Sequence, residues 1–212
     1  MRAALIDYGS GNIASAAKAL SRAAAETSGH EIVVTADPDI VRKSERIILP
    51  GVGAFADCMQ GLSAVPGMVE ALNESVIRGG KPILGICIGM QLMATAGREF
   101  GIHNGLNWIG GEVLPILPED PILKIPHMGW NEIELVQNHP LFAGLDPSAN
   151  AYFVHSFEMK PDDDAHLLAT TSYGGAVTAA IGRDNIVGTQ FHPEKSQGVG
   201  LKILGNFLSW NP

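Results

Sequence analysis

Cysteine is scarce in this sequence: among 212 residues there are two, Cys58 and Cys87. At most one disulfide can form, and a chain of this length does not need one to fold, so each cysteine requires its own explanation. Long hydrophobic runs are also missing. The first apolar stretch, Ala3 to Ile6, is broken by Asp7 and is far shorter than a signal-peptide core. We therefore expect a cytoplasmic protein that does not enter the membrane.

Positive charge is in short supply as well. The chain has 14 Lys and Arg residues against 22 Asp and Glu, a formal net charge of −8, and no cluster of basic residues. Such a chain repels phosphate backbones, so we expect no nucleic-acid partner. Apolar side chains are plentiful, at 46% of all residues, and 17% are charged. This composition predicts a folded interior in one domain covering residues 1–212, without repeats or a linker.

Short β-rich runs alternate with helical ones in the first half of the chain. In order, they are Arg2 to Ile6, Asn12 to Ala25, Glu31 to Thr35, Arg46 to Leu49, Met68 to Arg78 and Pro82 to Ile86. This alternation is typical of parallel strands joined by crossover helices.

After about Gly105 the predicted strands follow one another closely, with turn residues between them, which predicts hairpins. These strands are Glu112 to Leu117, Asn131 to Val136, Tyr152 to Phe157, Leu167 to Thr171, Ala176 to Ile181 and Ile186 to Gln190. A final helix is predicted from Ser196 or Gly200 to Trp210. The sum is a single three-layer α/β domain with a central mixed, mostly parallel sheet flanked by helices.

One cysteine lies in a pattern typical of catalysis. Gly85-Ile86-Cys87-Ile88-Gly89 follows a predicted strand and precedes a helical stretch, Met90 to Ala96, as a nucleophile elbow does. A nucleophile on so sharp a turn has strained backbone angles, and glycines two residues away leave room for the turn. The free N–H groups of a helix N-terminus stabilise a thiolate there, and that of Ile88 can face an oxyanion.

The alternative for Cys87 is a buried cysteine in a glycine-rich core turn, and the elbow spacing makes that the weaker interpretation. Cys58 has no such context. It lies in a stretch after Phe55 that is predicted to be helical, where a small core residue is the better interpretation.

A cysteine nucleophile needs a base, and Gln190-Phe191-His192-Pro193-Glu194 can supply one. In extended chain, His192 and Glu194 fall on one face, so the carboxylate can accept from one ring nitrogen while the other meets Cys87. Pro193 is expected to keep the backbone between them out of the helical region. Alone, the segment would favour a surface histidine beside a solvated glutamate; with the elbow, it favours a catalytic pair.

Two glycine-rich turns complete the candidates. Pro50-Gly51-Val52-Gly53 follows a strand, so in a parallel sheet it lies at the same edge as Cys87, although a turn without a role is also possible. Gly9 to Ala14 follows the first strand and matches a dinucleotide-binding fingerprint, with Asp37 as a conceivable ribose partner. That rival interpretation leaves the elbow and the His-Pro-Glu segment without a purpose.

Taken together, these motifs resemble the class I, triad-type glutamine amidotransferases, whose elbow reads G-x-C-x-G and whose base segment reads F-H-P-E. The resemblance spans nearly the whole chain and is closest to the glutaminase subunits of imidazole glycerol phosphate synthases. Only slight departures occur, such as Phe157 where a tyrosine is expected. The matching segments are Asp7 to Asn12, Gly85 to Gln91, Pro126 to Asn131, Tyr152 to Ser156 and Gln190 to Ser196.

The resemblance implies a flavodoxin-like fold and hydrolysis of glutamine to glutamate and ammonia by a Cys87, His192 and Glu194 triad. By similarity, the oxyanion hole takes the N–H of Ile88 and that of Val52, once the Gly51-Val52-Gly53 loop is correctly turned. The residues implied in glutamine binding are Gly51, Gly53, Gln91, Ser156 and Phe157. No cofactor and no metal are implied.

The resemblance further implies a partner, a cyclase subunit of barrel fold that uses the ammonia in histidine biosynthesis. The residues expected near that partner are Asn12, Trp130, Asn131 and Lys195. Two alternatives remain open. One is an amidotransferase serving another synthase, such as that of anthranilate, against which Pro126 to Asn131 argues. The other is a non-catalytic module that binds a nucleotide or adjusts a partner, against which the intact triad argues.

Overall fold

The computed structural model describes all residues, 1–212, and its centre is an eight-stranded sheet. The strand order is β2-β1-β3-β4-β14-β13-β12-β9. The first five strands pair in parallel: β2 (Glu31–Thr35), β1 (Arg2–Ile6), β3 (Arg46–Leu49), β4 (Ile83–Ile86) and β14 (Ile186–Thr189). The last three pair antiparallel: β13 (Ala176–Arg183), β12 (Leu167–Ser172) and β9 (Glu134–Leu135).

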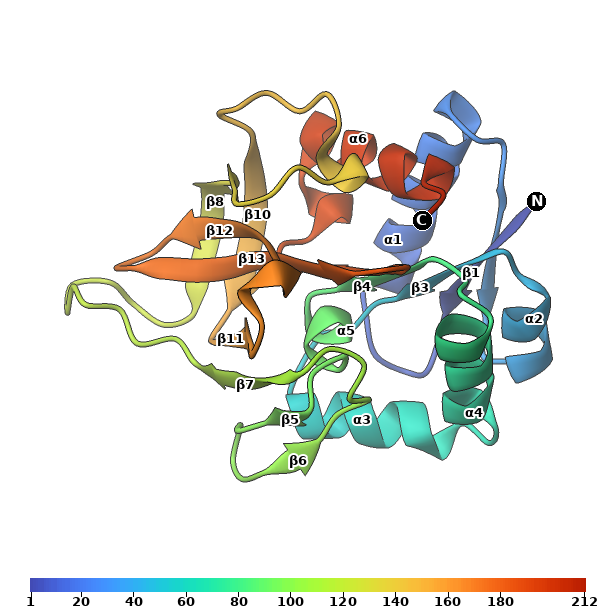
Figure 1. Ribbon diagram of the computed structural model, residues 1–212, viewed down its shortest axis with the longest axis horizontal. Helices are drawn as coiled ribbons and strands as arrows, with labels where there is room; N and C mark the ends of the chain where they lie inside the picture. Colours follow the sequence, from blue (N-terminus) through green and yellow to red (C-terminus); the bar gives the residue numbers. More distant parts are fainter.

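Helices cover both faces of this sheet, which gives the three layers that the sequence predicts (Figure 1). On one face α1 (Ile13–Glu26) packs beside α6 (Gln197–Ser209). On the other lie α2 (Pro38–Lys43), α3 (Phe55–Ala64), α5 (Ile88–Gln91) and α4 (Met68–Leu72), which continues as a π-helix over Asn73–Arg78. Because helices shield both faces, every residue of β3, β4 and β14 is buried.

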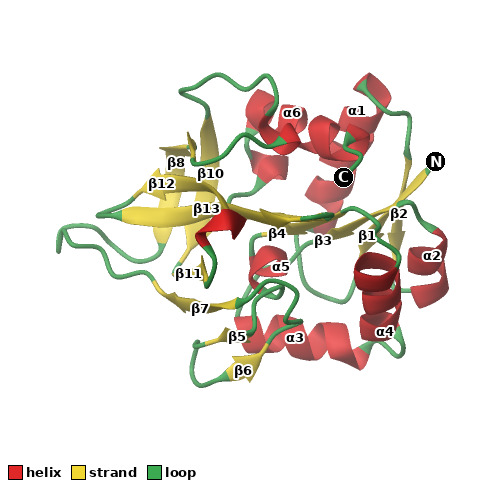
Figure 2. Cartoon of the chain, viewed as in Figure 1, coloured by secondary structure: helices red, strands yellow, loops and turns green.

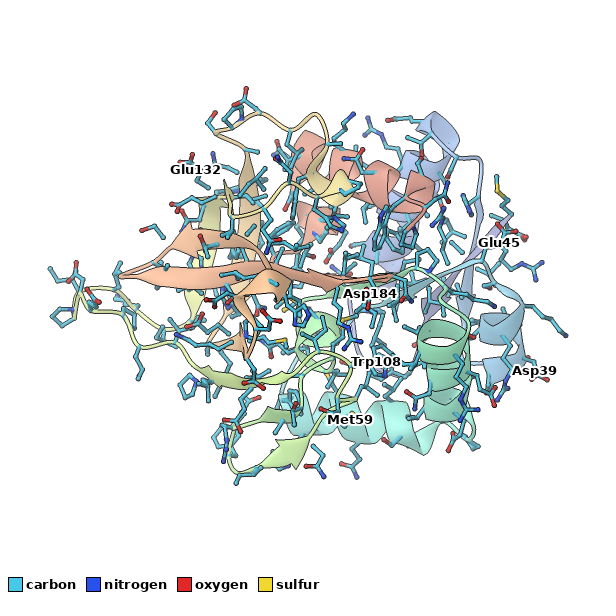
Figure 3. All side chains as sticks on the ribbon, viewed as in Figure 1. Asp39, Glu45, Met59, Trp108, Glu132 and Asp184 are labelled. Carbon is cyan, nitrogen blue, oxygen red and sulfur yellow. The ribbon has the colours of Figure 1, made fainter.

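Two smaller sheets flank the antiparallel end of the main one (Figure 2). In one, β8 (His127–Glu132) pairs antiparallel with β10 (Asn150–His155). The other has the order β11-β7-β5-β6, with β11 (Phe157–Pro161), β7 (Gly111–Pro115), β5 (Ala96–Gly97) and β6 (His103–Asn104). Glu132, at the end of β8, lies at the opposite end of the molecule from Asp39 of α2 (Figure 3).

All six elements predicted in the first half of the chain are present, with bounds that agree to within a residue. Two predicted strands of the second half are wrong as continuous elements. The strand expected over Asn131 to Val136 is split, because the N–H of Ile133 bonds to Ala149 whereas Glu134 and Leu135 pair with β12 in the main sheet. That expected over Tyr152 to Phe157 breaks at Ser156, where the chain leaves β10 and joins β7 as β11.

The helix predicted from Met90 to Ala96 is also wrong. Helix α5 ends at Gln91, since the carbonyls of Leu92 and Ala94 accept the N–H groups of Leu106 and Asn107 from a neighbouring loop. The chain then enters the short strand β5.

The parallel strands place four loops together. Their order, 2-1-3-4 followed by β14, is the flavodoxin-like one, in which ligands bind beyond the carboxyl ends of the strands. At that edge lie the turn after β1, the Pro50 to Gly53 loop after β3, Cys87 after β4 and the Gln190 to Glu194 segment after β14. None of the helices has the length and apolar character needed to cross a bilayer.

Candidate active site

The elbow is present and needs both of its glycines. Cys87 has φ 54° and ψ −111°, a positive φ that side chains rarely adopt, and it forms the N-cap of α5. A Cβ on Gly85 would lie 2.7 Å from the Gly89 carbonyl oxygen, and one on Gly89 would lie 1.8 Å from the Leu49 carbonyl oxygen. The strained turn is therefore possible only because strand, elbow and helix approach one another without side chains between them.

The thiol of Cys87 is 4% exposed and lies where polar groups converge. Gln190 donates its side-chain N–H to Cys87 Sγ at 3.6 Å. Ile88 is the first residue of α5, so its N–H has no acceptor within the helix. An anion formed on a substrate carbonyl held against Cys87 can meet this N–H.

His192 and Glu194 form the expected pair: His192 Nδ1 donates to Glu194 Oε1 at 2.8 Å, and the two side chains are 2% and 3% exposed. Burial alone lowers the pKa of His192, but hydrogen bonding and charge from Cys87 and Glu194 outweigh it and raise that pKa to about 9. The pair is therefore a charged imidazolium that is held by a carboxylate and can balance a thiolate on Cys87.

The role expected of Pro193 is wrong. Pro193 begins a 3-10 turn over Pro193–Lys195 instead of extending the chain, and His192 and Glu194 meet across this turn. Two contacts hold the turn. Ser196 Oγ donates to the carbonyl of His192 at 2.7 Å, and Gly200 lets α6 approach so closely that a Cβ there would lie 1.8 Å from the Pro193 oxygen.

The loop after β3 packs directly on the elbow. A Cβ on Gly51 would lie 2.8 Å from the N of Gly89. The Val52 N–H donates to Ser10 Oγ at 3.3 Å, and the Val52 carbonyl accepts from Ser10 Oγ at 2.7 Å and from Cys58 Sγ at 3.3 Å. Val52 as an oxyanion donor stays a prediction, because its N–H has to leave Ser10 to reach a substrate. Cys58 is the buried helical residue expected, with this contact in addition.

A cavity of about 630 Å³ opens in front of Cys87 and collects most of the predicted residues. Both Gly53 and Ser156 line it, whereas Gly51 lines a small adjoining space. Those that line the main cavity and matter below are Asn12, Gln91, Glu99, Phe157, His192 and Lys195. A second cavity, of about 680 Å³, lies by Trp210 and Arg183 and has no cysteine, serine or threonine in its lining.

Three side chains of this site were missed by the sequence reasoning. Gln190 lay within a recognised motif but was given no role, and it bonds both Cys87 and Gln91. Glu99 is the single carboxylate of the cavity lining, and its Oε2 accepts the N–H of Phe55 at the start of α3. His155 lines the cavity from β10. No spacing or motif signals Glu99, because a turn brings it to the site.

Two of the four residues expected near a partner line the cavity, and a third is connected to them through Tyr152. Asn12 and Lys195 line it, and Trp130, which is 50% exposed, lies edge-on to Tyr152 at 6.1 Å between ring centroids. The ammonium of Lys195 lies 5.6 Å from the centre of the same Tyr152 ring. Asn131 points its amide inward, to His127 and Ser172.

Comparison with known proteins identifies the family of this chain. The family model for "Glutamine amidotransferase class-I" matches residues 4–209. "Imidazole glycerol phosphate synthase subunit HisH" of Rhodospirillum rubrum is 57% identical, and the match covers all of both chains. The protein of the same name from Zymomonas mobilis is 56% identical over 99% of this chain and 96% of its own.

The fold has solved neighbours as well. A crystal structure of a glutamine amidotransferase superposes with a TM-score of 0.73 at 15% identity, covering 98% of this chain and 99% of that one. This likeness shows that the two chains share a fold. The chain belongs to the class-I glutamine amidotransferases, in the HisH family of imidazole glycerol phosphate synthase subunits.

Proposed function

We propose that this chain is the glutaminase subunit of an imidazole glycerol phosphate synthase and that it hydrolyses glutamine through Cys87, His192 and Glu194. The observation that carries the proposal is the buried pair of His192 and Glu194, in which His192 lines the same cavity as Cys87 and has a pKa raised to about 9. The assignment to an imidazole glycerol phosphate synthase is supported by the names of the relatives.

The chemistry has two halves. In the first, the Cys87 thiolate attacks the side-chain amide carbon of glutamine, and the bond to nitrogen breaks as His192 gives that nitrogen a proton, leaving ammonia and a thioester. In the second, neutral His192 takes a proton from water, the hydroxide attacks the thioester, and glutamate leaves as the thiolate re-forms. Glu194 fixes the imidazole by accepting from Nδ1, so the other ring nitrogen serves the reaction.

Each half passes through a tetrahedral oxyanion. The N–H of Ile88, at the start of α5, is the proposed first donor to this oxyanion, and the N–H of Val52 becomes the second when it turns from Ser10 to the cavity. Gln91 lines the pocket and donates to the Phe157 carbonyl at 3.1 Å, which shapes the Ser156–Phe157 wall against which glutamine lies.

Glu99 fits the α-ammonium group of glutamine, since it is the carboxylate of the cavity lining. We expect Glu99→Gln to raise the KM for glutamine by about tenfold with little change in kcat, because the loss is one of ground-state and transition-state binding alike. The glutamine side chain introduced at position 99 keeps an oxygen that can accept the Phe55 N–H, so the melting temperature should be unchanged. Steady-state kinetics check this. The control is Glu112→Gln, at a partly buried glutamate that pairs with Arg98 outside the cavity lining, and an unchanged KM in Glu99→Gln would contradict the assignment.

The proposed partner is a cyclase subunit of barrel fold, which receives the ammonia for histidine biosynthesis in the cytoplasm. The proposed contact surface consists of the exposed Trp130 and Lys195, the partly buried Tyr152 that both contact, and Asn12, which lines the cavity together with Lys195. The test is release of glutamate from glutamine by the chain mixed with the cyclase, together with co-elution of the two. Failure to bind the cyclase, or hydrolysis that the cyclase and its ligand leave unchanged, would overturn the synthase assignment.

The raised pKa of His192 predicts an alkaline limit. Protonated His192 must donate to ammonia, so kcat/KM should fall as pH rises through about 9. Glu194→Gln removes a charge that raises this pKa but keeps an acceptor for Nδ1, so the limit should move to lower pH. Stability should also decrease as pH rises. Because the pKa of His192 is raised on folding, the folded state binds more protons than the unfolded state, so the free energy of unfolding falls between about pH 6.5 and 9. A pH–rate profile that does not shift in Glu194→Gln would contradict this.

A further inference from the structure

Two buried histidines beside the cavity are not used by the chemistry above. His127 on β8 and His155 on β10 are 2% and 5% exposed, and His127 Nδ1 lies 2.9 Å from His155 Nε2. The ring of His127 is stacked between Phe153 and Tyr173, with centroids 4.9 Å and 4.1 Å away. Packing on both faces leaves this imidazole one orientation.

The partners of the two rings determine where each proton lies. The Phe157 carbonyl can only accept, so His155 Nδ1, at 2.9 Å, carries hydrogen. Burial lowers the pKa of His155 to about 4, so the ring is neutral and its Nε2 accepts from His127 Nδ1. Burial likewise lowers the pKa of His127 to about 4, and its Nε2 accepts from the Asn131 amide at 3.2 Å.

The amide of Asn131 has the matching orientation. Its Nδ2 also donates to the Ser172 carbonyl at 2.8 Å, and its Oδ1 accepts the N–H of Glu132 at 2.9 Å. Every donor from Asn131 to Phe157 therefore has one acceptor, and all the bonds run in one direction. We call this series of hydrogen bonds, from Asn131 through His127 and His155 to the Phe157 carbonyl, the relay. At the far end, the Phe157 oxygen also accepts from Gln91, which donates to Gln190, the residue bonded to Cys87.

We propose that Asn131, His127 and His155 are positioning residues: their hydrogen bonds hold the Phe157 carbonyl, and so fix the Ser156–Phe157 wall of the glutamine pocket relative to strand β8. Strand β8 turns Met128 and Trp130 outward, 60% and 50% exposed, while His127 and Asn131 point inward. A displacement of β8 is thereby transmitted to the wall against which glutamine lies. This role rests on the proposed glutaminase function.

The first test needs no activity. Nitrogen-15 NMR of the histidine rings in the isolated chain, at pH 7, should show His127 and His155 neutral with hydrogen on Nδ1, the tautomer their partners require. Hydrogen on Nε2, or a charged ring, at either residue would overturn the relay. This readout stands even if the complex with the cyclase releases no glutamate, a result that would instead contradict the proposed function.

The second test uses the complex with the cyclase and two pairs of variants. His155→Asn places an amide nitrogen where Nδ1 stood and keeps the donor to Phe157, whereas His155→Gln does not. We expect the KM for glutamine to rise about tenfold in His155→Gln and to stay within about threefold of the parent in His155→Asn, with kcat little changed in both. In the same way His127→Asn keeps a donor to His155, and His127→Leu, which raises KM, removes it.

Melting temperatures separate this from a merely structural role. If KM follows thermal stability across the four variants and ignores which donor is kept, the histidines only support the fold and the proposal is wrong. His166→Gln, the same chemical change at a histidine outside the relay, is the control and should leave KM unchanged. Equal KM values in His155→Gln and His155→Asn would likewise overturn the proposal.

Discussion

Glutamine hydrolysis should fall by at least about 10⁴-fold when Cys87 is replaced by alanine, because no other group in the cavity can form the thioester. Cys87→Ser should not restore it. The charged His192 next to it, with a pKa raised to about 9, balances a thiolate, and a serine hydroxyl does not ionise at neutral pH. The measurement is glutamate release by the complex with the cyclase, with the melting temperature as a check on folding.

The same claim can be checked on the parent chain by labelling. An electrophilic glutamine analogue should add one equivalent, and peptide mapping should place it on Cys87. Cys58 is the control within the molecule, since it is 1% exposed and turned toward Val52 and Ser10. Label on Cys58 alone, or hydrolysis that survives in Cys87→Ala, would contradict the assignment of the nucleophile.

The second large effect is expected at His192. His192→Asn should lower kcat by roughly 10³-fold or more, because the departing ammonia loses its proton donor and the thiolate loses its counter-charge. Alkylation of Cys87 by a small neutral reagent should also be slower at neutral pH, because the thiolate loses the counter-charge of His192. Stability should fall too, by up to about 3–5 kcal/mol, since the buried Glu194 carboxylate, with a side chain 3% exposed, keeps at most a neutral amide donor and loses the positive charge that balanced it.

A double variant separates these two consequences. His192→Asn with Glu194→Gln removes the unpaired charge, so the free energy of unfolding should recover while hydrolysis stays lost. Chemical denaturation and glutamate release measure the two quantities. Recovery of hydrolysis in the double variant would show that His192 acts through the fold and not through proton transfer.

The catalytic pattern was predictable because it is written in local spacing. Gly85 and Gly89 flank Cys87 for a steric reason that any elbow imposes, and His192 and Glu194 lie two residues apart. The backbone conformation that brings His192 and Glu194 together was not predictable. Pro193 can either extend the chain or begin a turn, and the choice depends on Ser196 and on the contact with Gly200, which sequence spacing does not reveal.

The misplaced elements have a common cause. The segment after Gln91 has helical composition, but carbonyls that a helix would use are taken by Leu106 and Asn107, distant in sequence. Likewise, the strand expected from Asn131 divides at Ile133 because two sheets compete for its edges. Glu99 reaches the site through a turn that no local motif predicts, and His155, although it lies within the recognised Tyr152 to Ser156 segment, has a role that depends on its pairing with His127.

The position of β14 beside β4 determines when, during synthesis of the chain, the catalytic groups can meet. The ribosome releases the chain from its N-terminus, so the nucleophile emerges long before its base. Until Ile186–Thr189 arrive, β4 lacks one of its two neighbours and the thiol has no imidazole to face. We therefore expect that a growing chain cannot hydrolyse glutamine, and that this activity appears only after β14 has inserted between β4 and β13.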